Sequence, residues 1–373
     1  MIEIVYNYYE TIYKINPNIF TDKSFLQGNP LYSNRAIIMI PCNCSFCNDK
    51  NKIKKFKEIF NRLLDINVYL TLSYSSDGIY ASGIREKHSL SEEFLDNVFT
   101  LLYDCNYGVH PMISYESIDN AIQNYEWWKL KLSEYNKKYH HKERYEFIPC
   151  MLEVRNEGWT DKTITKYIEF LNYMIDDRLK ICNNNLEHLA FDIFCHNSDN
   201  QTYERFGPPD MDPIKPIFTS YHQNYASCSL GHGLCIQCND LTLVPCHRLA
   251  YPFYHGGKFN YNDNEITEII ALENMNGYLN QIHCNSFFNP LCCTCDYQGI
   301  CIKGCHGAQF EAMSDPNIPI PDVCQLFKAK ANFLIHKYNE LGVLKIAINN
   351  GYLTDNAINA VNKILSILKE DLK

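Results

Sequence analysis

The 373-residue chain lacks the features that mark three broad classes of protein. It has no run of about 18 apolar residues, so no transmembrane span is expected. Its formal net charge of −9 argues against nucleic-acid binding driven by phosphate neutralisation. The first ten residues, MIEIVYNYYE, lack the basic start and small-residue cleavage site of a secretory signal. We therefore expect a cytoplasmic protein that binds neither nucleic acid nor membrane.

The lack of an export signal also determines how the 18 cysteines are interpreted. In a secreted chain they would suggest disulfides, but inside a cell thiols stay reduced. Clustered cysteines then indicate metal ligands, whereas an isolated one such as Cys182 indicates a small buried hydrophobic residue. Hydrophobic residues make up 46% of the chain and charged residues 21%, which is typical of a globular protein rather than a disordered one.

Strand-like and helix-like patterns alternate in the first half of the chain. Apolar or β-branched runs predict strands at 36–40, 68–74, 109–113 and 147–154, with Pro111 disturbing the third. Helical patterns follow each of them, at 53–64, from a cap at Ser89, at 117–136 and from Thr160. Four such units indicate an α/β protein with a parallel sheet and right-handed crossovers. Because a complete eight-unit barrel needs about 250 residues, we predict a partial (βα) barrel.

This reading divides the chain into four parts. Residues 1–34 form an N-terminal helical segment, and residues 35–216 form the partial barrel. Residues 217–330 form a small cysteine-rich domain organised around metal, and residues 331–373 form C-terminal helices.

Cysteines gather in two places. Eleven lie between Cys228 and Cys324. Within that stretch an array reads C-x2-C-x5-C-x3-C and is followed by one more cysteine: Cys292, Cys295, Cys301, Cys305 and Cys324. The second group, Cys42, Cys44 and Cys47, follows the first predicted strand. Zinc sites and iron–sulfur clusters both use cysteine thiolates, so the spacing alone leaves both metals open.

The downstream group resembles a known signature. Cys228, Cys246, the array and Cys324 are similar to the seven-cysteine pattern of SPASM domains, which extend radical S-adenosylmethionine peptide-modifying enzymes. The sequences around Cys246 (VPCHRL) and Cys305 (CIKGC) have the usual texture of that family. One departure is Leu241, which stands where the family usually has glycine.

The resemblance implies two auxiliary 4Fe–4S clusters. The first would use Cys228, Cys235, Cys246 and Cys305, and the second would use Cys292, Cys295, Cys301 and Cys324. Cys238 and Cys293 are alternates.

The upstream half resembles the radical S-adenosylmethionine core, in which a C-x3-C-x2-C loop after the first strand holds a 4Fe–4S cluster. Here the loop Cys42-x-Cys44-x2-Cys47 is two residues shorter, and the family's glycine-rich segment ending in Glu is absent from the sequence. Two strand ends resemble cofactor-side positions, and the residues concerned are Ser73, Asp77 and Arg85 in one and Glu153, Arg155 and Asn156 in the other. The alternative for these polar residues is ordinary loop capping.

Together these resemblances imply an enzyme with S-adenosylmethionine as cofactor. Reductive cleavage of the sulfonium would give a carbon radical that abstracts hydrogen from a peptide or protein substrate, with an electron donor such as flavodoxin or ferredoxin. Two alternatives remain open. A degenerate relative would keep the clusters as structural, electron-transfer or binding centres, and a zinc-stapled interaction protein would contain no iron. No catalytic acid or base can be singled out from the sequence.

Overall fold

The structure is a computed structural model. It describes the following residues: 2–18, 20, 36–80, 90–104, 108–138, 151–194, 212–216, 235–237, 240–262, 265–271, 290–297, 301 and 304–373.

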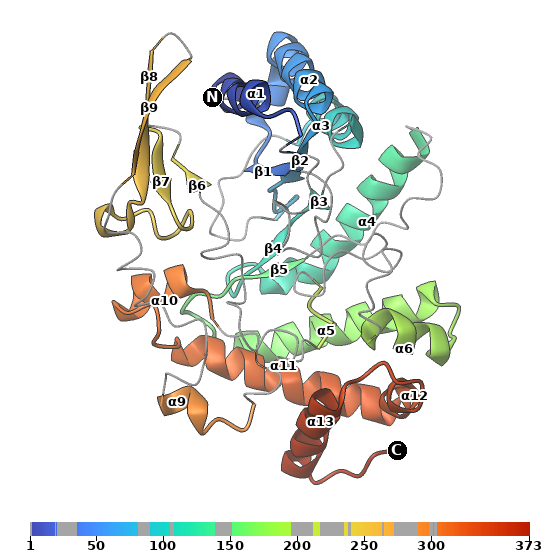
Figure 1. Cartoon of the computed structure of the whole chain (residues 1–373). Coiled ribbons are helices and arrows are strands. Elements are labelled where there is room, and N and C mark those ends of the chain that lie inside the picture. Colours follow the sequence, from blue (N-terminus) through green and yellow to red (C-terminus); the bar gives the residue numbers. More distant parts are fainter. Residues whose placement is uncertain are drawn as a thin grey trace.

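A parallel sheet of three strands forms the first layer. Its order is β1 (Ala36–Cys42), β2 (Val68–Tyr74) and β3 (Gly108–Val109), and Cys42 stands opposite Tyr74 in the register. The helices α1 (Ile2–Ile15), α2 (Lys50–Asp65) and α3 (Glu92–Asp104) gather at this end of the molecule (Figure 1). The periodic apolar residues of α2, including Phe56, Ile59 and Leu63, are buried in the core under the sheet.

A second parallel pair continues the chain. β4 (Met112–Ile113) pairs with β5 (Leu152–Glu153), and only His110 and Pro111 separate β3 from β4. The expected disturbance at Pro111 is therefore confirmed, since the strand pattern breaks there and the chain changes partner. A 3₁₀ turn at Ile118–Asn120 leads into α4 (Ala121–Lys138). That both parallel pairs belong to one partial barrel stays a prediction.

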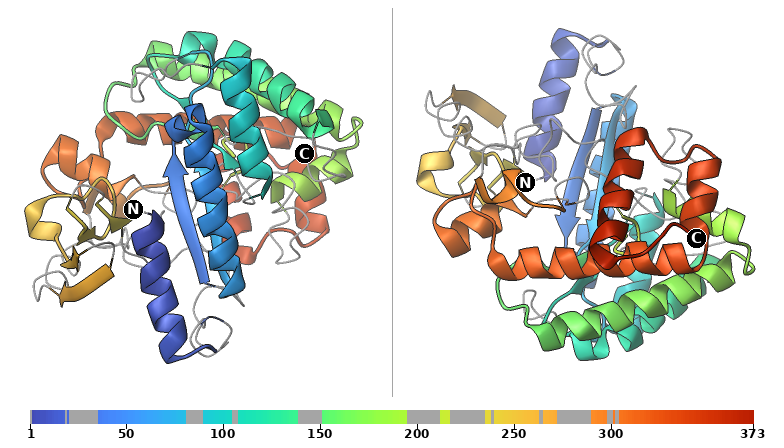
Figure 2. Two further views of the ribbon diagram at one scale, coloured as in Figure 1. Left: turned by 90° about the horizontal axis from the view of Figure 1, so that it is seen from above. Right: turned by 90° about the horizontal axis from the view of Figure 1, so that it is seen from below.

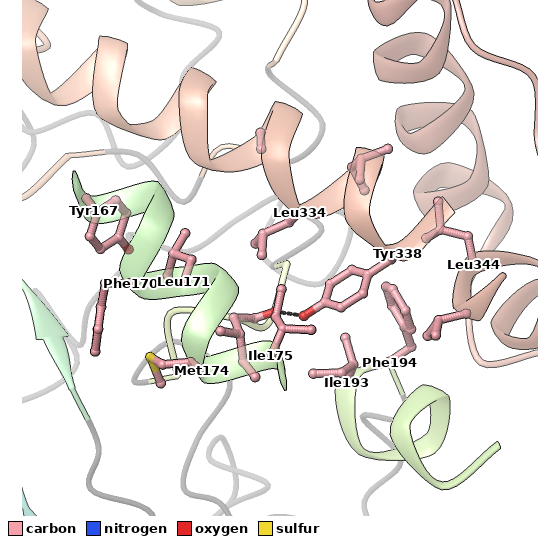
Figure 3. Close-up of a cluster of buried hydrophobic side chains, with 14 of the residues drawn as sticks. Tyr167, Phe170, Leu171, Met174, Ile175, Ile193, Phe194, Leu334, Tyr338 and Leu344 are labelled. Carbon is pink, nitrogen blue, oxygen red and sulfur yellow. Dashed lines mark hydrogen bonds between the residues drawn. The ribbon is translucent and has the colours of Figure 1, made fainter. Parts of the chain in front are cut away.

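Five helices supply most of the other large core, and Ala121 and Tyr125 of α4 also belong to it. The five helices are α5 (Asp161–Ile181), α6 (Leu186–Phe194), α11 (Pro321–Glu340), α12 (Val343–Asn349) and α13 (Asp355–Leu368). Figure 2 shows α11 running alongside α5. Side chains from α5, α6, α11 and α12 interdigitate, and the Tyr338 hydroxyl donates a 2.6 Å hydrogen bond to the Ile214 carbonyl (Figure 3).

A buried ion network fastens residues 212–216 to this helical core. The Arg178 guanidinium bonds Asp192 at 2.5 Å and Asp212 at 2.9 Å, and all three side chains are almost fully buried. Lys215 lies 3.6 Å from Asp192 on its other side. Because removing one member would leave a buried charge uncompensated, the network fixes this segment in one arrangement.

Short elements make up the cysteine-rich part. An antiparallel sheet has the order β6 (Cys235–Ile236), β7 (Thr242–Val244), β8 (Gly257–Asn262) and β9 (Glu265–Ala271). Two small helices follow, α9 (Pro290–Cys293) and α10 (His306–Met313). The long helix α11 then starts at Pro321 and continues through residue 330 into the helical core. The predicted boundary at 330 therefore falls inside a helix.

Several helix boundaries differ from the sequence-based expectations. α5 begins after Thr160 as predicted, with Thr160 and Thr163 capping each other. α3 is capped by Ser91, whose hydroxyl accepts from the Phe94 amide at 3.3 Å, whereas Ser89 lies outside the described residues. The helix α6 was not anticipated. Among the helices of the described residues, none has both the length and the apolar character needed to cross a bilayer.

Candidate metal centres

The first group of cysteines lies where β1 ends. Cys42 is the last residue of the strand, Cys44 has a left-handed backbone with φ 55, and Cys47 sits in the 3₁₀ turn Ser45–Asn48. The Cys44 amide points to the Cys42 sulfur at 3.2 Å, and the Cys47 amide donates to the Cys44 carbonyl at 2.8 Å. A non-glycine residue in this conformation is uncommon and is often found at functional sites. The turn folds the three thiols back on one another.

Contacts among these thiols change their acidity. The Cys44 side chain and backbone amide lower the pKa of Cys42 to about 7, against the opposing effect of burial. Contacts with Cys42 and Cys47, together with burial, raise the pKa of Cys44. Cys44 and Cys47 are fully buried. The thiolate is the form of cysteine that binds metals. A Cys42 thiolate is therefore available as a metal ligand near neutral pH.

Secondary structure anchors the loop on all sides. The Ser75 amide donates to the Cys42 carbonyl at 2.8 Å, and the Asn97 side chain of α3 donates to the Cys47 carbonyl at 3.0 Å. Phe46 stacks on Phe56 of α2. The loop is therefore held by β2, α2 and α3 without needing a metal.

Tyr74, which the sequence did not single out, is buried beside these cysteines. Its side chain is 1% exposed, and it packs edge-on against Phe94 and Trp128. Burial raises its pKa, Ser76 opposes that rise, and the neighbouring thiols of the loop add to it. Its hydroxyl has no hydrogen-bond partner of good geometry among the described residues. Only the pairing of Tyr74 with Cys42 across β1 and β2 could have indicated that it lies beside the cysteines.

The polar residues after β2 are largely used within the fold. Asp77 is 6% exposed, accepts from the Met112 amide at 3.2 Å, and receives the Asn124 side chain on its carbonyl at 2.5 Å. Asp77 thus ties the end of β2 to β4 and α4. The backbone of Ser73 belongs to β2, its side chain is not described, and Arg85 lies outside the described residues.

The three residues at the end of β5 face different partners. The Glu153 side chain is 5% exposed and bonds both Lys330 of α11 and Tyr167 of α5. Burial would raise the pKa of Glu153, but Lys330 and Arg155 hold it below its ordinary value. Arg155 lies over the Phe327 ring at 5.9 Å, and the side-chain oxygen Oδ1 of Asn156 accepts from the Arg248 guanidinium at 2.9 Å.

The first downstream set comes together around the β6–β7 hairpin. Cys235 pairs with Val244 across the two strands, so Cys246 follows two residues later on the same hairpin. Burial raises the pKa of Cys235, and the nearby Cys246 thiol adds to the effect. Cys305 precedes α10 and contacts the Arg248 guanidinium. Cys228, the fourth predicted member, and the alternate Cys238 lie outside the described residues.

The second downstream set is only partly assembled. Cys292 lies in α9, and the Cys295 amide donates to the Cys292 carbonyl at 3.2 Å. Burial raises the pKa of Cys324, in the first turn of α11, and the Cys295 thiol raises it further. Cys301 packs against the apolar cluster around Ile320 and Val323. Cys295 therefore lies near enough to Cys324 for its charge to act on the pKa of that thiol, while Cys293 is exposed.

Leu241 occupies the turn between β6 and β7 with φ 58. This is the left-handed conformation that glycine adopts without strain. The side chain is nevertheless buried and packs with Leu243 and Tyr8 of α1. Leu241, at the position where the SPASM signature has glycine, thus adopts a backbone conformation that glycine favours.

No disulfide joins the described cysteines, and within the described residues no three ligating side chains are arranged to hold a metal ion directly. The donor chemistry fits best at the upstream loop, because the Cys44 side chain contacts those of Cys42 and Cys47. In the downstream part, Cys246 and Cys295 lie near enough to Cys235 and Cys324, respectively, to raise the pKa of those two thiols.

Comparisons with known proteins identify no relative of this chain. No protein-family model matches the chain, and no curated protein or solved structure matches it. The functional argument therefore depends on the residues and their arrangement.

Proposed function

We propose that this chain is an iron–sulfur protein of the radical S-adenosylmethionine type that modifies a peptide or protein substrate. The observation that carries the proposal is the loop at the end of β1, where three cysteine thiols are turned toward one another by a left-handed Cys44. Chemistry in parallel α/β folds collects at the carboxyl ends of strands, which is where this loop lies.

The donor set fits a three-cysteine cluster. Cys42, Cys44 and Cys47 supply three thiolates, which would leave one iron of a 4Fe–4S cluster open to a bound cofactor. With S-adenosylmethionine there, the site would supply reductive cleavage of the sulfonium and hydrogen abstraction from substrate. The chain's own contribution is to bury the thiols, exclude water with Tyr74 and Phe46, and hold the loop through Asn97.

Two downstream clusters complete the proposal. Cys235, Cys246 and Cys305, with Cys228, would hold one, and Cys292, Cys295, Cys301 and Cys324 would hold the other. The effect of the Cys295 thiol on the pKa of Cys324, 29 positions away, supports the second grouping. The left-handed backbone of Leu241 at the family's glycine position supports the resemblance as a whole. The substrate class and a flavodoxin- or ferredoxin-like electron donor rest on the sequence resemblance.

A second candidate function has an observation of its own. Asp77, Glu153 and Asn156, which the resemblance assigns to the cofactor side, already have protein partners. A degenerate relative would keep the clusters for structure or electron transfer and would not cleave the cofactor.

Anaerobic reconstitution followed by iron and sulfide analysis tests the proposal. Wild-type protein should bind about twelve irons, and Cys44→Ala should bind about eight, because only the upstream cluster is lost. Reduced wild-type protein should release 5′-deoxyadenosine from the cofactor, and Cys44→Ala should release none.

Cys182→Ala is the matched control, because Cys182 is a buried thiol in the helical core, away from both cysteine groups. It should keep all the iron and full release of 5′-deoxyadenosine. Wild-type protein with twelve irons and no release would favour the degenerate relative. Zinc in place of iron would overturn both proposals.

A further inference from the structure

Residues 212–216 are buried against the helical core although they belong to no helix or strand. Ile214 is fully buried, and Asp212 and Lys215 are 6% and 3% exposed. The segment closes its own turn, because the Asp212 carbonyl accepts from the Lys215 amide at 3.0 Å and the Asp212 Oδ1 accepts from the Ile214 amide at 3.3 Å. These local bonds give the segment a shape that does not depend on the helices around it.

Two charged residues of the segment meet two charged residues of the core. Asp212 bonds Arg178 of α5 at 2.9 Å, and Lys215 lies 3.6 Å from Asp192 of α6. Arg178 and Asp192 also bond each other at 2.5 Å. Each side of the contact contributes one positive and one negative charge. The docked arrangement is therefore neutral, and so is each side taken alone.

This balance separates the loss of one residue from the departure of the whole segment. Removing one member of a buried ion network is strongly destabilising, because it leaves a charge without compensation. If the segment leaves as a unit, Arg178 and Asp192 stay paired with each other, and no unpaired charge is left in the core. Buried ion networks are weak evidence for stability, and selecting one arrangement or switching between two is their best-attested role.

One neutral hydrogen bond adds to the four charges. The Tyr338 hydroxyl of α11 donates to the Ile214 carbonyl at 2.6 Å (Figure 3). Along the chain, the segment lies between α6, which ends at Phe194, and β6, which begins at Cys235. Docking of the segment therefore ties the connection that leads into the cysteine-rich part to the helical core.

We infer that residues 212–216 are a reversible latch, which docks on α5, α6 and α11 as a unit and undocks without unfolding the helical core. The two charges on each side hold the docked latch in register. The inference goes beyond the proposed function and is independent of it, because no residue of this contact is a predicted metal ligand. When the latch undocks, the connection into the cysteine-rich part is released from the helical core.

Hydrogen exchange of the full-length protein in low urea, followed by mass spectrometry of overlapping peptides, tests the latch. Pro213 and Pro216 have no amide hydrogen, so the signal of the segment comes mainly from the bonded amides of Ile214 and Lys215. In wild-type protein these amides should open at least about tenfold more often than the buried amides of α5 and α11. If they open only together with α5 and α11, the segment is a fixed part of the core and the inference is overturned.

Charge variants test what holds the latch closed. Asp212→Asn leaves one buried positive charge in excess, and Lys215→Met leaves one negative charge in excess. Each should raise the opening of the segment by about a hundredfold or more. The double variant is neutral again, so it should open less often than either single variant. A double variant that opens more often than both would show that charge balance does not hold the latch.

Asp176→Asn is the matched control. Asp176 pairs with Lys337 between the same two helices, α5 and α11, but the carboxylate is half-exposed, so the variant should change the opening of the segment by no more than about fivefold. If the charge variants unfold the whole chain, Tyr338→Phe decides, because it removes only the hydroxyl bonded to the Ile214 carbonyl. It should raise the opening of the segment by about tenfold while the protection of α5 is unchanged. Equal loss of protection in the segment and in α5 would overturn the latch.

Discussion

The two cysteine regions differ in what holds them. Cys42, Cys44 and Cys47 follow a seven-residue strand and are packed between α2, α3 and β2, and two of them are fully buried. The downstream cysteines sit on elements such as β6 and α9, which have two and four residues, and the described ones are half-buried or exposed. The difference teaches that the upstream loop is held by the elements packed around it, whereas the described downstream cysteines sit on short elements. If those cysteines bind metal as we propose, the downstream part should depend on that metal for order.

Removing the metal that we propose should widen the difference between the two regions, and it is the largest effect we expect. Metal binding to cysteine sites contributes on the order of 10 kcal/mol of folding free energy. After chelation, peptides covering β6, β7 and α9 should lose hydrogen-exchange protection, while peptides from β1, α2 and α5 keep theirs. Mass-spectrometric hydrogen exchange on holo and chelated protein measures this. Equal protection of both regions after chelation would show that the downstream part is stable without metal.

The attachment of α11 to the strand region gives a second, smaller test. Glu153 and Lys330 form a buried ion pair between β5 and α11. Glu153→Gln should lower the free energy of unfolding by about 2 kcal/mol at pH 7, because a hydrogen bond between charged groups is lost.

The pH dependence of this variant has a fixed sign. The pKa of Glu153 is below 4.5 in the folded protein, so its stabilisation is fully present above that value and is lost as the pH falls through the folded pKa. The difference between wild type and Glu153→Gln should therefore narrow below pH 4.5 in denaturant titrations. Glu58→Gln, in an exposed pair with Lys54, should change stability by less than about 0.5 kcal/mol at any pH. If the difference in unfolding free energy between wild type and Glu153→Gln stayed constant down to acid pH, it would contradict the lowered pKa of Glu153.

The smallest effect concerns Tyr74 beside the upstream thiols. Tyr74→Phe removes a buried hydroxyl that has no partner of good geometry in the described part of the chain, so metal-free protein should gain about 1 kcal/mol. If the hydroxyl bonds a group held by the loop, the gain should vanish after iron loading. Unfolding of both forms by guanidinium chloride measures the difference. Tyr135→Phe is the control, because that hydroxyl does have an acceptor on Glu92 and its loss should destabilise both forms.

Local sequence patterns predicted the elements that local forces determine. The apolar runs gave β1 and β2 nearly to the residue, and Thr160 marked the start of α5 because a capping hydroxyl acts within one turn. The helix α6 escaped prediction because the Asn-rich turn before it resembles a loop. In fact Asn183 and Asn184 adopt positive φ, and the Asn185 side chain accepts from the amides of residues 187 and 188 at the start of the helix.

Candidate site residues were predictable only where their spacing is short. Cys42, Cys44 and Cys47 could be grouped from sequence because five positions separate them. The roles of Glu153, Asn156 and Arg248 could not, since each depends on a partner brought close by packing of distant segments. A strand-end polar residue looks the same in sequence whether it faces a cofactor or a lysine on a helix from another part of the chain.

The helix α11 constrains how this protein can change its length. It carries Cys324 near its start, Lys330 in the middle and Tyr338 near its end, and each of the three faces a different partner. One residue inserted or deleted between them would rotate everything beyond it by about 100°. Cys324 could then no longer face Cys295 while Lys330 faces Glu153 and Tyr338 faces Ile214. We expect this helix to tolerate substitutions at its exposed positions but no insertion or deletion between Cys324 and Tyr338.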